Sequence, residues 1–222
     1  MNFKNAYWYF SGILPERFCD ELIQHGNSQR EKIATIGSTS ERIKKRHPKV
    51  KHDNIQKKLT KKDIQDLKKT RDSNVAFVND RWIYDEITPY IHRANQNAGW
   101  NFDIDYFESC QLTIYKNKQF YDWHSDPFPE PYNKPDQPHF HGKQRKLSAS
   151  VQLSDPKDYK GGDLEIQPRT EKDASIVLNT TRHFGARGSI IVFPSHLWHR
   201  VKPVTKGTRY SLVLWALGYP FR

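Results

Sequence analysis

The feature that most constrains the fold of this chain is a change of hydrophobic period near residue 102. From there onward, short runs rich in β-branched and aromatic residues alternate with turn signals at 160–163, 185–188 and 206–207. The runs are FDIDYFESCQLTIYKN, FYDWHSD, KLSASVQLSD, DLEIQPR, SIIVFPS and RYSLVLWALG. Several short strands at this spacing predict an antiparallel sandwich or barrel.

The first hundred residues carry helical rather than strand-like signals. Residues 13–26 place apolar side chains at near-helical spacing, and Gly26 is expected to end that helix. Residues 80–99 show the same spacing, and Pro89 is expected to kink that helix or break it in two. The order of elements is therefore helices first and a β core second.

A short basic helix is predicted at 60–70, because Thr60 and Asp63 stand at the spacing of a capping box. Residues 28–58 are polar and only weakly periodic, and we expect a loop there. The fold class is then mainly β with N-terminal helices (α+β). We expect one domain over all 222 residues, with a helical support region at 1–100 and the β core at 101–222.

Several protein classes are disfavoured by composition. No run of eighteen apolar residues occurs, so we expect no membrane span, and the first residues lack the apolar stretch of a signal peptide. Only Cys19 and Cys110 are present, which excludes a disulfide scaffold and a zinc–thiolate cluster. A reducing cytoplasm fits this cysteine usage best.

The net charge of +11 is concentrated in one segment. Residues 41–72 contain thirteen Lys and Arg against five Asp and Glu, a net of +8. Such a run is most often a solvated face. The sharper interpretation is a docking surface for an acidic protein, a nucleic acid or a ribonucleoprotein.

The stretch YDWHSDPFPEP, residues 121–131, places His124 and Asp126 two positions apart. On a strand this spacing points both side chains to one face. His199 follows a later, buried-looking strand. Two ligands from one strand and one from a distant strand predict a facial triad of two histidines and one carboxylate, the donor set of a non-haem Fe(II) site with open positions.

Arg209 and Ser211 repeat the same spacing ten residues after His199. Both can face one interior, where an arginine fork binds a carboxylate and the hydroxyl adds a donor. A metal triad with an inward arginine suggests a dicarboxylate that chelates iron at one end. 2-Oxoglutarate is such a molecule.

The ordered motifs resemble the prolyl-4-hydroxylase-like branch of the Fe(II)/2-oxoglutarate dioxygenases, and the PKHD-type hydroxylases above all. The motifs are Y-x5-Y-x2-H-x-D from Tyr115 to Asp126, RKLS at 145–148, GGDL at 161–164, G-x-x-I-x-F-P-S at 188–195, H-R-V-x-P-V at 199–204 and G-x-R-Y-S-L at 207–212. The resemblance covers roughly residues 71–218. It implies a double-stranded β-helix, or jelly-roll, core.

The resemblance also implies roles for single residues. His124, Asp126 and His199 would bind iron, and Arg209 would anchor 2-oxoglutarate. Tyr115 would donate a hydrogen bond to that cosubstrate, and Ser211 would help to bind it. Fe(II), 2-oxoglutarate and O2 would be the cofactors, with ascorbate as a stimulant, and no catalytic side chain beyond the metal centre is required. The expected reaction is hydroxylation of a C–H bond, most simply in a prolyl residue of a protein or peptide.

Other interpretations stay open at this point. The substrate can instead be a free amino acid or small metabolite, and a non-catalytic jelly-roll or nucleic-acid-binding module is a further alternative. His196 is the rival of His199, and His139 with His141 invites a second metal site. Trp215 is the best candidate for a pocket wall. The proline-rich segment 127–144 is expected to be a long surface loop, and its position suggests a lid.

Overall fold

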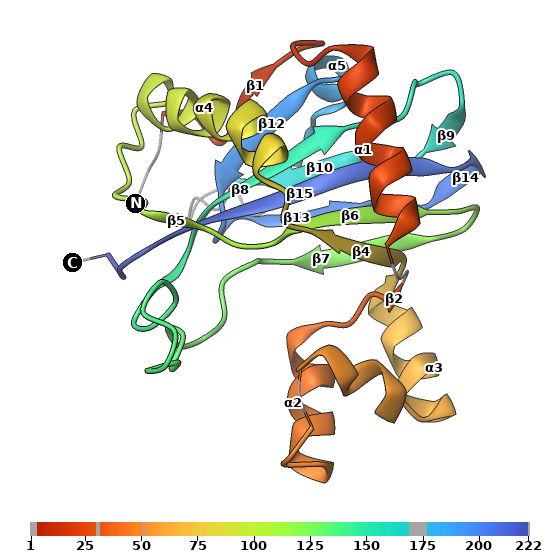
Figure 1. Ribbon diagram of the computed structural model, residues 1–222. Coiled ribbons are helices and arrows are strands. Elements are labelled where there is room, and N and C mark those ends of the chain that lie inside the picture. The colour runs from red at the N-terminus through yellow and green to blue at the C-terminus, as the bar shows by residue number, and fades with distance from the viewer. Residues whose placement is uncertain (1–3, 30–31, 51, 169–176, 222) are drawn as a thin grey trace.

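Two antiparallel sheets form the core of the computed structural model, which describes residues 4–29, 32–50, 52–168 and 177–221 (Figure 1). The larger sheet has the strand order β1-β12-β8-β15-β6-β4-β2, with β5 added beside β15. The smaller sheet has the order β11-β10-β13-β7-β3, and β14 pairs with β9 in a separate ribbon. The expected jelly-roll core of antiparallel strands is confirmed.

The strands of the larger sheet are β1 (Trp8–Phe10), β2 (Lys32–Ile33), β4 (Asn74–Val78), β5 (Tyr106–Phe107), β6 (Cys110–Tyr115), β8 (Gln144–Gln152), β12 (Ile190–Pro194) and β15 (Arg209–Gly218). Those of the smaller sheet are β3 (Arg71–Asp72), β7 (Phe120–His124), β10 (Leu164–Gln167), β11 (Leu178–Asn179) and β13 (Trp198–Val201). The ribbon consists of β9 (Tyr159–Gly161) and β14 (Val204–Gly207). The helices are α1 (Glu16–Ser28), α2 (Gly37–Arg46), α3 (Lys61–Thr70), α4 (Arg81–Asn97), α5 (Thr181–Phe184) and the 3₁₀ helix η1 (His52–Lys58).

The larger sheet has one apolar face and one largely polar face, because its strands alternate with period two. Leu147, Ala149 and Val151 of β8 join a hydrophobic core with α1 and α4. Ser148, Ser150 and Gln152, the residues between and beside them, are also buried and face the other way. On β15, Arg209 and Ser211 continue that polar face. The interior between the two sheets is therefore built to hold polar groups.

Helix α1 runs two residues past Gly26, so the expected stop at that glycine is wrong. Gly26 is buried against β6, and a Cβ there would lie 2.2 Å from Cδ2 of Leu112. The glycine thus permits close approach of helix and sheet instead of ending the helix. Helix α4 continues as one element through Pro89, so of the two expected effects, a kink or a break, the break is wrong.

The loop expected at residues 28–58 is wrong. They contribute β2, α2 and η1, and with α3 they form a helical extension that projects from the end of the larger sheet where β2 lies (Figure 1). Ile43, Ile55 and Leu67 are buried within it. The capping box of α3 is confirmed.

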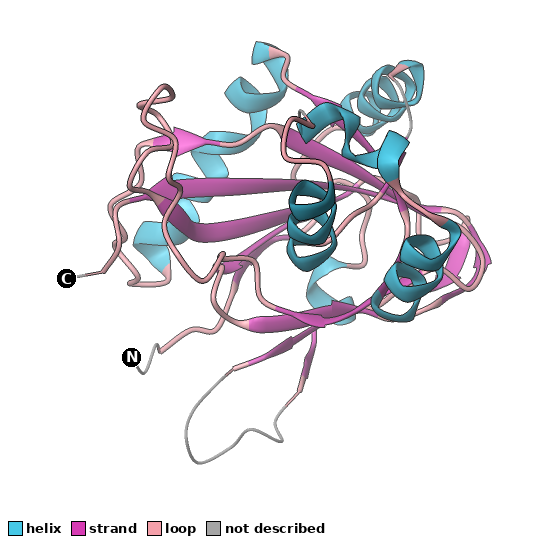
Figure 2. Cartoon of the chain, turned by 90° about the horizontal axis from the view of Figure 1, so that it is seen from below, coloured by secondary structure: helices cyan, strands magenta, loops and turns pink. Residues whose placement is uncertain are grey.

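The segment between β7 and β8 is a long connection, as expected, and turns hold it together. Two backbone hydrogen bonds close it, because Tyr132 N–H donates to the carbonyl oxygen of Lys143 and Gly142 N–H donates to that of Tyr132. The ring of His139 stacks on Tyr106 at 5.1 Å between centroids. Figure 2 views the chain from below and shows helices and connecting loops around the sheets. Among the helices that the structure describes, none combines the length and the apolar character that crossing a bilayer requires.

Candidate functional site

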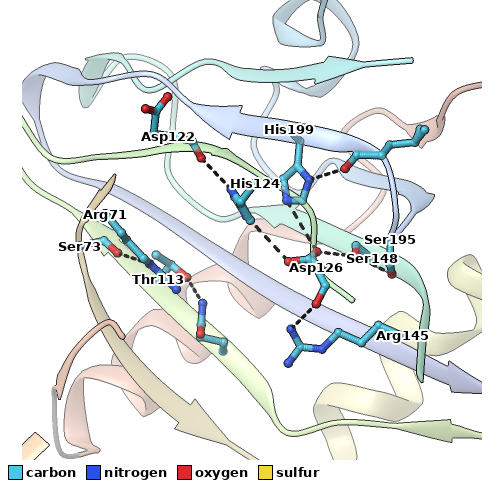
Figure 3. Close-up of polar contacts among 12 residues, drawn as sticks. Arg71, Ser73, Thr113, Asp122, His124, Asp126, Arg145, Ser148, Ser195 and His199 are labelled. Atoms are coloured by element: carbon cyan, nitrogen blue, oxygen red, sulfur yellow. Dashed lines mark hydrogen bonds and ion pairs between the residues drawn. The ribbon is translucent and has the colours of Figure 1, made fainter. Parts of the chain in front are cut away.

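Three side chains converge between β7 and β13. These strands pair antiparallel with His199 opposite His124, and Asp126 follows directly after β7 (Figure 3). Nε2 of His124 lies 3.8 Å from Oδ1 of Asp126, and Nε2 of His199 lies 3.6 Å from Oδ2. One donor atom from each residue lies within 4.8 Å of the others, and this is the one group of at least three His, Cys, Asp or Glu side chains within the described residues that can hold a metal ion.

Backbone carbonyls fix the orientation of both imidazoles. Nδ1 of His124 lies 2.8 Å from the carbonyl oxygen of Asp122, and Nδ1 of His199 lies 3.0 Å from that of Leu197. A carbonyl only accepts, so each Nδ1 carries the proton and each Nε2 presents its lone pair toward Asp126. This tautomer is the one that a metal-binding imidazole needs.

The charges of the group suit a cation. Burial raises the pKa of Asp126, but the two imidazoles, Arg145 and a hydrogen bond from Ser148 outweigh burial and hold that pKa at about 2. Burial lowers the pKa of His124 well below its usual value, and His199 lowers it further. The carboxylate is thus charged and the His124 ring neutral, which are the protonation states of metal ligands.

A network of hydroxyls and rings holds the three residues in place. Ser148 Oγ donates to Oδ2 of Asp126 at 2.6 Å and lies 2.8 Å from Oγ of Ser195. The ring of Tyr121 stacks on His124 at 3.5 Å between centroids, and the Arg71 guanidinium lies 4.3 Å from the Tyr121 centroid. Sequence reasoning missed Arg71, because its place beside the site depends on the pairing of β3 with β7.

Arg209 is a buried cation on the polar face of the larger sheet. We call the interior between the two sheets, which holds Arg209 and the triad of His124, Asp126 and His199, the chamber. Arg209 is 2% exposed, and no carboxylate forms an ion pair with it within the part of the chain that the structure describes. Its Nη1 lies 3.5 Å from Oγ of Ser211. Gly162 makes room for it, since a Cβ there would lie 2.9 Å from Cδ of Arg209. A buried charge without a counter-ion is costly, so this guanidinium is suited to an anionic ligand.

Tyr115 is buried beside Arg209, and its ring centroid lies 5.8 Å from Cζ of that arginine. It pairs with Arg209 across β6 and β15 and is 3% exposed. Burial raises the pKa of Tyr115, Arg71 and Arg209 oppose that rise, and the Asp126 carboxylate adds to it. The Tyr115 phenol therefore interacts electrostatically with Arg71, with Arg209 and with the Asp126 carboxylate. The structure thus brings Tyr115, Arg209 and Ser211 together in the same interior as His124, Asp126 and His199.

A second cluster borders Asp126 on the side of β8. Arg145 forms a bidentate pair with Glu108, with both N–O distances at 2.7 Å, and its Nη1 donates to the backbone oxygen of Asp126 at 3.3 Å. The same guanidinium lies 3.8 Å from the Trp215 ring. Nε1 of Trp215 is buried and has no hydrogen-bond partner among the residues that the structure describes. Trp215 was expected as a pocket wall, but the pairing of Glu108 with Arg145 carries no local sequence signal.

The other histidines lie apart from the triad. The ring of His196 meets Phe221 edge-on at 6.5 Å, and His183 accepts from or donates to the Tyr7 hydroxyl at 2.8 Å. His139 and His141 do not join a described metal-binding group, so the second metal site considered for them is not formed. Two imidazole nitrogens and one carboxylate, with Arg209 beyond them, fit Fe(II) and a dicarboxylate chelator.

Comparisons with known proteins agree with this geometry. The sequence model of the 2OG-Fe(II) oxygenase superfamily matches residues 110–217. A PKHD-type hydroxylase of Gloeothece citriformis is 41% identical over 70 residues, covering 31% of this chain and 28% of that protein. One of Stutzerimonas stutzeri is 39% identical over 69 residues, covering 31% and 27%. The chain thus spans 27 to 28% of the length of these two relatives.

Solved structures show the same fold. A prolyl-4-hydroxylase of Pseudomonas putida superposes with a TM-score of 0.59 at 16% identity, covering 96% of this chain and 92% of that one. A viral collagen prolyl hydroxylase from Paramecium Bursaria Chlorella virus-1 gives 0.60 at 17%, with 97% of both chains covered. At these identities the likeness is one of fold. Residues 110–217, just under half of the chain, thus carry the motifs and the site of the 2OG-Fe(II) oxygenase superfamily.

Proposed function

We propose that this protein is an Fe(II)- and 2-oxoglutarate-dependent hydroxylase that acts on a C–H bond of a protein or peptide, most simply at a prolyl residue. His124, Asp126 and His199 hold the metal in this proposal. Arg209 binds the far carboxylate of 2-oxoglutarate, with Ser211 and Tyr115 beside it. The single observation that carries the proposal is the buried Arg209 without a described counter-ion in the chamber that also holds the triad.

The matching of charges supports 2-oxoglutarate in particular. A neutral ligand leaves the Arg209 cation uncompensated, whereas a carboxylate meets the guanidinium fork with charge-assisted hydrogen bonds. The second end of the ligand must reach a metal beyond Tyr115, which a dicarboxylate with a 2-oxo group does by chelation. Both ends are thus recognised by groups that the chain places in one interior.

The chain itself positions groups and excludes water. When bound, Fe(II) and 2-oxoglutarate supply the oxidising chemistry, in which decarboxylation of the keto acid by O2 is coupled to hydroxylation of the substrate. The backbone carbonyls behind His124 and His199 keep both Nε2 atoms turned inward. Ser148 holds the Asp126 carboxylate in place, and no side chain need act as a general base.

A peptide substrate is supported by the cluster beside Asp126. Nε1 of Trp215 is a buried donor without a partner in the described part of the chain, and a backbone carbonyl of a substrate is a suitable acceptor for it. A prolyl hydroxylase from Trichoplax adhaerens, solved with a peptide fragment of hypoxia inducible factor, shares the fold with a TM-score of 0.58 at 15% identity, over 96% of this chain and 84% of that one. Both points favour a peptide over a free amino acid.

The test of the metal and cosubstrate is an anaerobic titration with Fe(II) and then 2-oxoglutarate, followed by visible absorption. We expect a weak charge-transfer band in the wild type, no band in His199→Ala and a weakened band in Arg209→Ala. His196→Ala is the matched control, since it removes a histidine three residues away, and it should keep the band. A folded wild-type protein without any band would refute the proposal.

The substrate is tested separately by mass spectrometry. Proline-containing peptides and free proline are each incubated with the iron-loaded protein, 2-oxoglutarate and O2, and a gain of one oxygen atom is sought. The proposal expects this gain in a peptide, with a raised peptide KM in Trp215→Phe because the indole donor is lost. Oxidation of free proline alone would overturn the peptide part and leave the hydroxylase part intact.

A further inference from the structure

The helical extension formed by residues 37–70 carries most of the positive charge of the molecule. The extension comprises α2, η1 and α3. The basic segment 41–72, which overlaps nearly all of the extension, has a net charge of +8, whereas the whole chain has a net charge of +11. The proposed hydroxylase chemistry uses none of these residues. The extension is therefore a second feature that needs an explanation of its own.

The arginines of the extension are engaged inside it. Asp63 is buried, and Nη2 of Arg46 lies 2.5 Å from its Oδ2 while Nη2 of Arg42 lies 3.1 Å from its Oδ1. The hydrogen bond from Arg46, then those from Thr60, keep the pKa of Asp63 far below its usual value. These guanidinium groups tie α2 to α3.

The lysines, by contrast, point outward. Seven are exposed and form no ion pair with the side chains that the structure describes: Lys44, Lys45, Lys49, Lys57, Lys58, Lys61 and Lys62. Arg46, Lys49, Lys57 and Lys58 line a groove of about 770 Å³, and none of the described residues that line it is a carboxylate. Cations from two helices and the turn between them thus share one open surface.

Helix stability accounts for only part of this charge. Cations near a helix C-terminus are favourable, which explains Lys44 and Lys45 in the last turn of α2. Lys61 and Lys62, however, lie in the first turn of α3, where the helix dipole opposes positive charge. Their presence is explained better by a ligand outside the helix.

The ligand that lysines favour follows from how their charge acts. Arginine forks bind both carboxylate and phosphate, but Arg42 and Arg46 are occupied by Asp63, which leaves lysines as mobile point charges. Exposed lysine–carboxylate pairs each contribute about 0–1 kcal/mol. Contacts with a phosphate backbone gain more together, because every neutralised phosphate releases condensed counterions.

We propose that the extension binds the phosphate backbone of a nucleic-acid duplex without reading its sequence. Residues 28–76 contain no Phe, Tyr or Trp, so unpaired bases find no aromatic platform there. A duplex, which presents phosphates in a regular array and hides its bases, fits an all-lysine surface better than a single strand. The proposal stands independently of the hydroxylase chemistry.

The test measures fluorescence anisotropy of short labelled DNA and RNA duplexes with the full-length protein, without iron or 2-oxoglutarate, between about 50 and 200 mM salt. We expect a steep loss of affinity with salt and weaker binding of a single strand. Lys49→Gln/Lys57→Gln/Lys58→Gln should lower the salt slope by about three and the affinity by about tenfold or more. The DNA and RNA arms show which duplex is preferred.

The matched control is Lys157→Gln/Lys160→Gln/Lys206→Gln, which removes the same charge from exposed lysines of the β core. It should bind as the wild type does, and circular dichroism confirms that both variants fold. Equal losses in the two variants would overturn the proposal, as would absent or salt-insensitive binding. Tighter binding of a poly-glutamate peptide than of either duplex would assign the surface to an acidic protein instead.

Discussion

The interior chamber and the helical extension organise charge in opposite ways. The chamber holds a few buried charges, among them Asp126 and Arg209, and each is placed by strand register and by specific hydrogen bonds. The extension holds many exposed lysines on short helices around a single buried carboxylate, Asp63. Removal of one buried charge should thus have a large effect on ligand binding. Removal of one exposed lysine should have a small effect, and only the loss of several lysines together should weaken binding strongly.

The sharpest test of that difference is Asp126→Asn. The amide keeps the size of the side chain but removes the anion that faces both imidazoles. We expect Fe(II) affinity to fall by more than about 100-fold, because even outer partners of metal ligands cost 10–100-fold. Calorimetric titration with Fe(II) under argon measures it. Wild-type affinity in the variant would show that the three residues do not form the metal site.

Arg209→Met should have the next largest effect. We expect 2-oxoglutarate affinity to fall by about 30- to 150-fold, since a charged hydrogen bond contributes about 2–3 kcal/mol. The ligand-free protein should not lose stability, because the variant removes a buried charge without a described ion-pair partner. Equilibrium dialysis and urea unfolding measure the two quantities. A large loss of stability with normal cosubstrate binding would make Arg209 a structural residue.

Ser148→Ala tests the support of the triad. The variant removes the 2.6 Å hydrogen bond to Oδ2 of Asp126 and leaves all three proposed ligands in place. We expect Fe(II) affinity to fall by about 10- to 100-fold. Ser150→Ala, on the same face of β8, is the control and should change metal affinity little. Similar losses in both variants would point to a general effect on the strand.

Asp63→Asn moves the test to the extension. It weakens the capping box of α3 and the ion pairs with Arg42 and Arg46, and we expect a cost of about 1–2 kcal/mol. Hydrogen exchange should speed up in α2 and α3, while the β core keeps its protection. Uniform acceleration would contradict the separation of the two regions.

The same residue predicts a pH dependence. Folding lowers the pKa of Asp63 below its ordinary value of 3.8. The ionised carboxylate therefore contributes its full stabilisation of the folded state above pH 3.8, and this contribution is lost as the pH falls below that value. Exchange rates in α3 of the wild type should therefore approach those of Asp63→Asn only under acidic conditions. Wild-type rates in α3 that stay unchanged on acidification would show that Asp63 does not support the helix.

The smallest expected effect is that of Lys61→Gln. Removing one cation from the first turn of α3 should raise stability by about 0.3 kcal/mol, because the helix dipole disfavours it there. Duplex affinity should fall only slightly. Lys69→Gln, at the other end of α3, is the control and should lower stability by a similar amount. Thermal unfolding at low ionic strength resolves the opposite signs.

Local spacing predicted the parts of the site that depend on one strand. Arg209 and Ser211 stand two apart within β15, so strand geometry places them together, and the same spacing pointed to His124 with Asp126, although Asp126 lies two residues past the end of β7 and its N–H donates to Ser195. The strand runs of the core followed from the same period. These features are local, so the chain displays them without any knowledge of its neighbours.

The rest depends on contacts between distant segments. Arg145 and Ser148 are three apart, which period two would place on opposite faces, yet both contact Asp126 because the register of β8 against β15 shifts near Arg145. Gly26 lies inside α1, where its lack of a side chain leaves room for Leu112, a residue 86 positions away. The helices at 37–58 bury few apolar residues. The ion pair between Arg46 and Asp63 joins α2 to α3, and no hydrophobic periodicity in the sequence predicts such a pair.

The hydrogen bond from Ser148 also bears on the denticity of Asp126. Its hydroxyl donates to Oδ2 at 2.6 Å and occupies one lone pair of that oxygen, which makes Oδ1 the stronger metal-binding atom of the two. With the metal bound as proposed, Asp126 would then bind mainly through one oxygen. A hydroxyl group outside the three proposed ligands would thus influence how many coordination positions small molecules can share.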